Sequence, residues 1–309
     1  MSTSIAFLIC TEAGPIEDYS LLLVESIRKF GGSLKDAPIY SFEVRNTPEI
    51  SQKTSKSLKA LDVVHVREFL NNKYPDFAFA NQPCLGTWAE ENLDADILVL
   101  LDSDQILFNE PEEVLLPSEY DIGVRPVFIK NVGSEGQNDP NEEYWQKLYE
   151  IVGTKNNMFV TTTVDQKNIR AYWNAGLVVV KRNLGLFSNW KNNLEKVMES
   201  KIQPRNGGIF YVSQTTMAAT ICAMTEKVWT LSPQYNYPIS LHNRVPESKQ
   251  IRSFDNLVSI HYTNSNKFRD NGLDKSLASL SNLDRTSQKY KWLFEYFAKH
   301  WTASNGMLT

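Results

Sequence analysis

The stretch DILVLLDSD, residues 96–104, joins five consecutive apolar residues to two aspartates one residue apart. An apolar run of this length predicts a strand buried on both faces, as in a parallel sheet. Ligands of open α/β sheets bind at the carboxyl ends of the strands, where Asp102 and Asp104 would emerge. Two carboxylates at this spacing suit a hard divalent cation whose other ligands are phosphate oxygens and water. The alternative is that Asp-Ser-Asp only turns the chain.

Similar apolar runs alternate with segments of helical period, which favours an α/β fold with a mostly parallel central sheet flanked by helices. No internal repeat or hinge-like composition divides the chain, so we expect a single domain over residues 1–309. Residues 131–143 predict a long surface loop, with regular structure resuming at 144–152. The predicted strands are 5–10, 39–44, 63–66, 96–101, 177–181, 228–231 and 257–261, and the predicted helices are 19–30, 50–60, 81–91, 187–198, 212–222 and about 287–301.

Composition excludes several classes of protein. The 309 residues include 32 Lys and Arg against 36 Asp and Glu, without a basic cluster, which argues against a nucleic-acid binder. The longest apolar runs, 5–10 and 97–101, are shorter than the ~18–20 residues of a membrane span, and the N-terminus lacks the pattern of a signal peptide. Cys10, Cys84 and Cys222 form neither a disulfide framework nor a zinc pattern. We therefore expect a cytoplasmic protein without a transmembrane segment.

A second candidate site element lies far downstream, where an apolar run ends in His261 and is followed by Lys267. An imidazole at a strand end suits the coordination of a metal, and a lysine six residues later suits contact with a diphosphate. A lone histidine is more often structural, but among the four histidines this one has the appropriate local setting.

Two further segments are weaker signals. Asn174 and Gly176 precede the predicted strand 177–181, where a small residue would let a ligand sugar approach the backbone and an amide would bind its hydroxyls. An ordinary turn is the alternative. The pair Ser213-Gln214 opens a predicted helix, and residues 232–237 follow a predicted strand.

Taken in order, these segments resemble the motifs of the retaining, metal-dependent glycosyltransferases of the GT-A fold, in the family of glycogenin, galactinol synthase and the bacterial lipopolysaccharide galactosyl- and glucosyltransferases. The resemblance spans roughly residues 5 to 268. The matching motifs are LLDSDQILF (100–108) for the family's DxD, WNAGLVVV (173–180) for its asparagine-glycine strand, SQ (213–214) for its aspartate-glutamine pair, LSPQYN (231–236) for its proline-tyrosine-asparagine loop and IHYTNSNKF (260–268) for its closing histidine-lysine motif.

The resemblance implies a nucleotide-diphosphate sugar donor, a UDP-hexose, together with Mn²⁺ or Mg²⁺. The metal would act as a Lewis acid on the leaving nucleotide diphosphate, and Lys267 would add positive charge there. The acceptor would be a glycan, a small molecule, a lipid-linked molecule or a protein. The implied roles are metal binding for Asp102, Asp104 and His261, donor contact for Ser103, Gly176 and Lys267, base binding for Thr11 and Tyr19, and contact with the donor sugar near its anomeric carbon for Asn174 and Gln214.

Three positions depart from the family's pattern. Ser213 replaces the aspartate of the aspartate-glutamine pair, the segment Asn81-Gln82-Pro83 stands where a lysine usually precedes the DxD, and Phe268-Arg269 follows the closing lysine. These departures concern the choice of donor sugar. No carboxylate stands out as a covalent nucleophile, and retention in the family is explained by attack on the face from which the diphosphate leaves.

Other functions remain as alternatives. A haloacid-dehalogenase-type phosphatase also places DxD after a strand, but there the strand is the first one and a threonine follows two residues later. A nucleotidyltransferase would have a basic, glycine-rich loop after the first strand, and residues 11–15 (TEAGP) contain no basic residue. A non-catalytic carbohydrate-binding protein with a degenerate site is the third alternative, suggested by Ser213 and Gln82.

The C-terminal segment 287–301 predicts an aromatic, mildly basic amphipathic helix. Such a helix lies on an anionic membrane, packs on its own domain or joins two copies in a homo-oligomer. We favour packing, because the negative net charge gives little attraction to an anionic, peripheral membrane surface.

If Lys267 contacts the departing diphosphate, Lys267→Ala should lower kcat/KM by roughly an order of magnitude or more with little change in melting temperature. Steady-state kinetics and a thermal melt of the purified variant would measure both. A large loss of stability with unchanged kinetics would identify a structural lysine instead.

Overall fold

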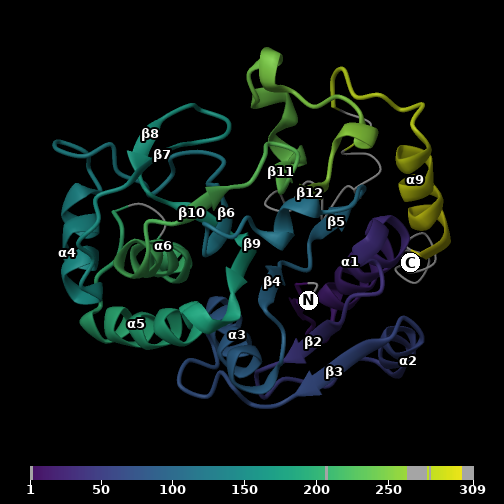
Figure 1. Ribbon diagram of the computed structural model, residues 1–309, viewed down its shortest axis with the longest axis horizontal. Coiled ribbons are helices and arrows are strands. Elements are labelled where there is room, and N and C mark those ends of the chain that lie inside the picture. The colour runs from purple at the N-terminus through teal and green to yellow at the C-terminus, as the bar shows by residue number, and fades with distance from the viewer. Residues whose placement is uncertain (1–2, 206–207, 263–276, 278–279, 301–309) are drawn as a thin grey trace, which may run out of the picture.

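The computed structural model describes residues 3–205, 208–262, 277 and 280–300. Among these residues, seven strands form the central sheet (Figure 1). Strand β9 runs antiparallel to its neighbours β4 and β6, and the remaining pairs are parallel, so the predicted α/β class with a mostly parallel sheet is confirmed. The order is β10 (Val228–Thr230), β6 (Ile122–Pro126), β9 (Trp173–Lys181), β4 (Ile97–Leu101), β1 (Ile5–Cys10), β2 (Ile39–Glu43) and β3 (Val63–Arg67).

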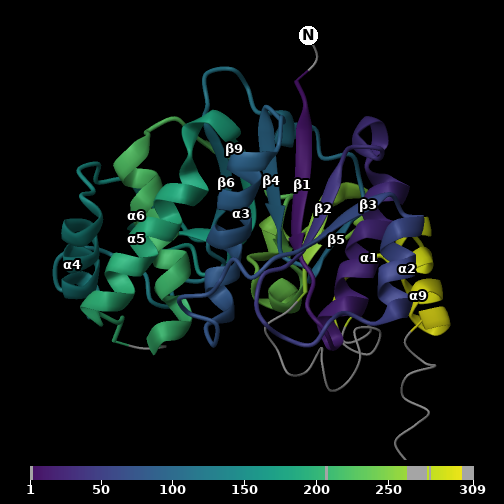
Figure 2. The ribbon, with the colours of Figure 1, turned by 90° about the horizontal axis from the view of Figure 1, so that it is seen from below.

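Helices cover both faces of this sheet (Figure 2). Successive side chains of a strand point to opposite faces, so Leu98 and Leu100 of β4 enter one apolar cluster while Val99 and Leu101 enter another. The first cluster includes residues of α3 (Asn81–Asn92), α4 (Glu142–Val152), α5 (Leu186–Ser200) and α6 (Val212–Met224), and the second includes residues of α1 (Pro15–Phe30) and α2 (Gln52–Ala60).

A smaller sheet completes the edge at which β4 ends. Its order is β11 (Tyr237–Pro238), β12 (Ser259–His261) and β5 (Gln105–Leu107). Strand β5 follows directly after the Asp102–Asp104 turn, and β12 pairs with it antiparallel so that His261 is opposite Gln105. This register brings the end of β12 to the end of β4. A separate hairpin pairs β7 (Phe159–Thr161) with β8 (Asn168–Arg170).

Helix α1 begins four residues earlier than the predicted position 19. Pro15 occupies its first turn, where a missing N–H costs no hydrogen bond. The Glu17 carboxylate accepts a hydrogen bond of 3.0 Å from the Gly14 N–H, which closes the N-terminus of the helix. Glu17 and Asp18, which precede the predicted start of the helix, therefore belong to it.

The predicted surface loop 131–143 is only partly correct, because α4 begins at Glu142 and part of the loop is buried. The Trp145 indole donates to the Val132 carbonyl at 2.9 Å, and the Ser134 hydroxyl donates to the Glu142 carboxylate at 2.5 Å. Both Val132 and Ser134 are fully buried. Side chains of the following helix therefore hold this polar segment against the body of the protein.

Strand β9 begins at Trp173, four residues before the predicted start at 177, so the segment for which a turn was the alternative is part of the strand. Strands β5, β6, β7, β8 and β11 were not predicted. Four of these contain only two or three residues, too few for a periodic pattern, and β6 contains Gly123, Arg125 and Pro126. The other predicted strands and helices are present with ends shifted by a few residues.

The C-terminal helix α9 (Gln288–His300) packs on the protein itself beside α1 (Figure 1). The Trp292 ring meets Phe30 of α1 edge to face at 4.9 Å, and Leu293 is fully buried. Intramolecular packing, the favoured alternative, therefore accounts for its apolar face; Trp301 lies outside the described residues. None of the helices in the described part of the chain is long and apolar enough to cross a membrane.

Replacing Leu293 by Ala should lower the free energy of unfolding by about 2–5 kcal/mol, because it leaves a cavity between α9 and the apolar residues beneath it. Urea unfolding at equilibrium would measure the change. Glu295→Ala is the matched control on the exposed face of the same helix and should change stability by less than about 0.5 kcal/mol. Equal stability of wild type and Leu293→Ala would show that α9 does not dock in solution.

Candidate active site

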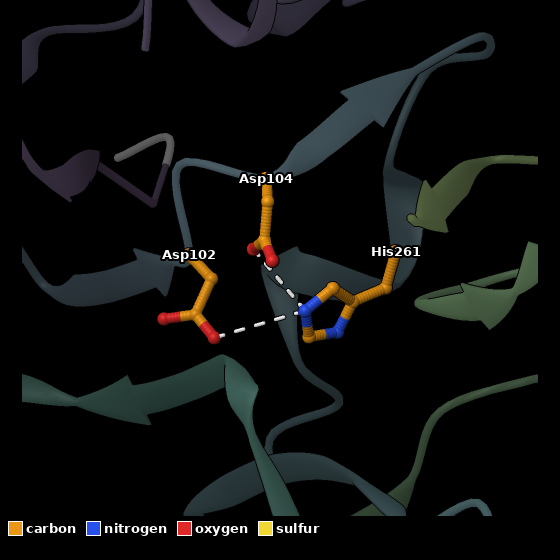
Figure 3. Close-up of side chains that lie close together, drawn as sticks. All are labelled: Asp102, Asp104 and His261. Atoms are coloured by element: carbon orange, nitrogen blue, oxygen red, sulfur yellow. Dashed lines mark ion pairs between the residues drawn. The ribbon is translucent and has the colours of Figure 1, made fainter. Parts of the chain in front are cut away.

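Asp102, Asp104 and His261 converge at the carboxyl end of β4 (Figure 3). The Nε2 atom of His261 lies 3.1 Å from Oδ1 of Asp104 and 3.9 Å from Oδ2 of Asp102. One ligand atom from each residue lies within 4.8 Å of the others. Ligand atoms ~2.1 Å from one octahedral cation are ~3 Å apart when adjacent and ~4.2 Å apart when opposite. The two distances from Nε2 of His261 lie within this range, so the three side chains could hold a single Mg²⁺- or Mn²⁺-sized cation.

The turn between β4 and β5 holds the two carboxylates. The Asp102 N–H donates to the Gly176 carbonyl of β9 at 2.9 Å, and the side-chain amide of Gln105 donates to the same carbonyl. The Tyr262 N–H donates to the Asp104 carbonyl at 3.2 Å. Both neighbouring strands thus fix the backbone that carries the acidic pair, while Ser103 between them is partly exposed.

The charges of the cluster perturb one another. Loss of water around Asp102, together with the negative charge of Asp104, raises the pKa of Asp102 to about 6. Burial lowers the pKa of His261, but the charges of Asp104 and Asp102 more than offset this effect and raise it above its ordinary value. Two carboxylates held this close repel each other, and a bound cation would relieve that repulsion.

Gln82, noted in the sequence only as a departure from a lysine, is a direct partner of this cluster. Its side-chain amide donates to Oδ1 of Asp102 at 2.5 Å and to the Ala175 carbonyl at 3.3 Å. The amide leaves Oδ2 of Asp102 facing His261. Its position at the start of α3, 20 residues before Asp102, gives no local signal of this contact.

Gly176 is at the centre of the site, where no larger residue fits. A Cβ atom built on it would lie 2.7 Å from Cε1 of His261, 2.8 Å from Oδ1 of Asn174 and 3.0 Å from Oδ2 of Asp102. The sequence predicted that a ligand sugar approaches the backbone here. In the structure, the side chains of His261 and Asp102 come close to the Gly176 backbone, and contact of a donor sugar with Gly176 stays a prediction.

The amides of Asn174 and Gln214 lie in the same region and are bonded to the protein. Oδ1 of Asn174 accepts from the Gly176 N–H at 2.8 Å and from Nδ2 of Asn236 at 3.1 Å. Oε1 of Gln214 accepts from the Ala175 N–H at 3.1 Å, and its Nε2 donates to the Tyr172 hydroxyl at 2.7 Å. Their contact with a donor sugar stays a prediction.

The predicted base-binding residues come from the end of β1, the strand that pairs with β4 on the side opposite β9, and from α1. Thr11 directly follows β1, is fully buried and accepts a hydrogen bond of 2.8 Å from the Ser41 hydroxyl. Tyr19 of α1 packs edge to face on Tyr262 at 5.8 Å. Lys267 lies outside the described residues, so its role also stays a prediction.

Ser213 and Glu12 have structural partners that the sequence did not reveal. Ser213 donates to the Phe79 carbonyl at 2.7 Å, which ties the start of α6 to the segment before α3. Glu12, next to Thr11, is buried and forms an ion pair with Arg45, and the Asn81 amide donates to it at 3.1 Å. A charged residue two positions after a buried strand is the only local sign of this pair.

Residues 7–225 match the family model described as the Rhodobacterales glycosyltransferase domain. The chain belongs to this glycosyltransferase family. This family assignment replaces the phosphatase and nucleotidyltransferase alternatives. No curated protein matches the chain.

Solved structures show that this glycosyltransferase has the GT-A fold. The bifunctional glycosyltransferase WbbM aligns with a TM-score of 0.54 and 15% identity over 94% of this chain and 52% of its own. GlyE of Streptococcus pneumoniae TIGR4 aligns with a TM-score of 0.53 and 12% identity over 95% of this chain and 64% of its own. An active-site mutant of LgtC aligns with a TM-score of 0.51 and 10% identity over 92% of this chain and 99% of its own. The chain thus spans about half the length of WbbM and less than two thirds of GlyE.

Asp102→Asn should leave the metal-free protein at least as stable as wild type at pH 8. Because the pKa of Asp102 is raised on folding, this carboxyl destabilises the folded state by an amount that grows between pH 3.8 and about 6 and is complete above pH 6, and an amide removes that cost. The gain should be at most ~1 kcal/mol, since the side chain is 35% exposed and water screens the repulsion. It should vanish below the ordinary pKa of 3.8.

Thermal melts in EDTA and in Mn²⁺ would measure both effects, and Mn²⁺ should stabilise wild type but not Asp102→Asn. Asp36→Asn, at an exposed aspartate outside the site, is the control and should behave as wild type in both conditions. A clear loss of stability of Asp102→Asn in EDTA would give this carboxylate a structural role instead.

Proposed function

We propose that this glycosyltransferase transfers a hexose from a nucleotide-diphosphate sugar, a UDP-hexose, to an acceptor with retention of configuration and with Mn²⁺ or Mg²⁺ bound by Asp102, Asp104 and His261. The observation that carries the proposal is the convergence of these three ligands at the carboxyl end of β4. Two carboxylates and one imidazole suit Mn²⁺ and leave coordination positions for diphosphate oxygens.

A cation bound there would stabilise the negative charge that develops on the leaving diphosphate. The protein's own residues would orient the donor around it. Thr11 and Tyr19, at the ends of β1 and α1 nearest the cluster, would hold the base, and Lys267 would contact the diphosphate. Gln82 holds the carboxylate of Asp102, so its amide supports the metal site rather than adding positive charge.

Retention without a covalent intermediate is supported by the chemistry of the residues at and around the predicted contact with the donor sugar. The side chains of Asn174, Gln214 and Tyr172 are amides and a phenol, not carboxylates. In this proposal, the acceptor hydroxyl attacks from the face on which the diphosphate leaves, and the diphosphate accepts its proton. Residues 1–309 would act as one catalytic domain in the cytoplasm, where the three free cysteines would stay reduced.

A panel of nucleotide sugars tested in Mn²⁺, Mg²⁺ and EDTA would identify the donor. The cognate donor at a hundred times its Kd should stabilise the protein by about 2.7 kcal/mol in the presence of the metal. Asp104→Asn should abolish this metal-dependent stabilisation, and Asp36→Asn should retain it. Release of nucleoside diphosphate in the presence of an acceptor would then measure turnover. Equal stabilisation by the donor in EDTA, in wild type and in Asp104→Asn, would contradict the metal assignment.

A further inference from the structure

A line of hydrogen bonds connects the backbone of β9 to the imidazole of His261. The Gly176 N–H donates to Oδ1 of Asn174 at 2.8 Å, and Nδ2 of Asn236 donates to the same oxygen at 3.1 Å. Oδ1 of Asn236 lies 3.0 Å from Nδ1 of His261. Asn236 and His261 are 1% and 5% exposed, so water has little access to this line.

The direction of every bond in the line follows from its first member. A backbone N–H can only donate, so the atom of Asn174 that it meets is the amide oxygen. The atom of Asn236 facing that oxygen must then be its NH₂ group, and the remaining atom of Asn236 is its oxygen. That oxygen can only accept, so Nδ1 of His261 carries a proton.

We propose that Asn236, anchored by Asn174, is a positioning residue that holds the neutral His261 ring in the tautomer with its proton on Nδ1. The lone pair of Nε2 then faces the carboxylates of Asp102 and Asp104, as a metal ligand requires. This inference rests on the proposed metal site, and it gives Asn174 a role besides contact with a sugar.

Without Asn236, the opposite tautomer would be favoured. Nε2 lies 3.1 Å from Oδ1 of Asp104, so a proton on Nε2 would form a hydrogen bond to that carboxylate. Such a proton would occupy the position of the cation. The oxygen of Asn236 offers Nδ1 an acceptor on the other side of the ring, and the Phe128 ring packs edge to face on the imidazole at 5.7 Å and limits its rotation.

The backbone of Asn236 is also fixed. Its φ angle is +50°, in the left-handed region that asparagine tolerates better than most residues. Its N–H donates to the Ser259 hydroxyl of β12 at 2.8 Å, two residues before His261 in the same strand. The amide therefore has a defined position relative to the histidine that it contacts.

The test is the affinity for Mn²⁺ alone, measured by electron paramagnetic resonance of the free ion at pH 8. Asn236→Gly removes the amide, and glycine adopts a positive φ without strain. Its Kd should rise about 10- to 100-fold, the usual loss when the outer partner of a metal ligand is removed. Asn138→Gly is the matched control, an exposed asparagine with a φ of +74°, and its Kd should equal that of wild type.

A double-mutant cycle with His261→Ala separates positioning from general damage. If Asn236 acts through the imidazole, Asn236→Gly in the His261→Ala background should change the Kd by less than about twofold. Equal losses in both backgrounds, or an unchanged Kd in Asn236→Gly alone, would overturn the inference while the metal site stands. If Asn236→Gly does not fold, Asn174→Ala takes its place in the same double-mutant cycle with His261→Ala. Wild-type affinity in His261→Ala, or no binding by wild type, would overturn the metal site and the inference together.

Discussion

The site depends on the close packing around Gly176, which contacts most of its parts. Its carbonyl accepts from the Asp102 N–H and positions the turn that carries both carboxylates. Its N–H begins the hydrogen bonds that reach His261. The absence of a Cβ leaves room for the imidazole and for Asp102. This residue of strand β9 thus helps to position three side chains from other parts of the chain, those of Asp102, Asp104 and His261.

Holding the two carboxylates close together lowers the stability of the folded protein, and the proposed metal-binding function explains this cost. Asp102 and Asp104 are held together beside a buried imidazole, and the pKa of Asp102 is raised to about 6 because its charge is disfavoured there. A fold selected for stability alone would separate these groups or replace them with neutral residues. The amides of Gln82, Asn174 and Asn236 compensate in part, because each is bonded within the site and orients a group without adding charge.

The smaller sheet explains how distant segments reach this place. Strand β5 continues from the acidic turn, β12 pairs with it and β11 pairs with β12, so that residues near 105, 237 and 260 lie side by side. The same region packs on α1 and on α9, whose buried Tyr290 contacts Phe254 at 5.6 Å. The C-terminal helix therefore supports the element that carries His261.

The sequence by itself determined the features that are local. The apolar run 97–101, the acidic pair after it and the helical period of 187–198 predicted elements that the structure contains, because burial on one or two faces imposes a repeat over a few residues. The order of five motifs predicted the glycosyltransferase family. The tertiary structure alone decided that Gln82 holds Asp102, that Gly176 makes room for His261 and that Asn236 contacts the imidazole. Each of these contacts joins residues 20 to 85 positions apart, and it depends on strand register and on the packing of other elements, which no local pattern encodes.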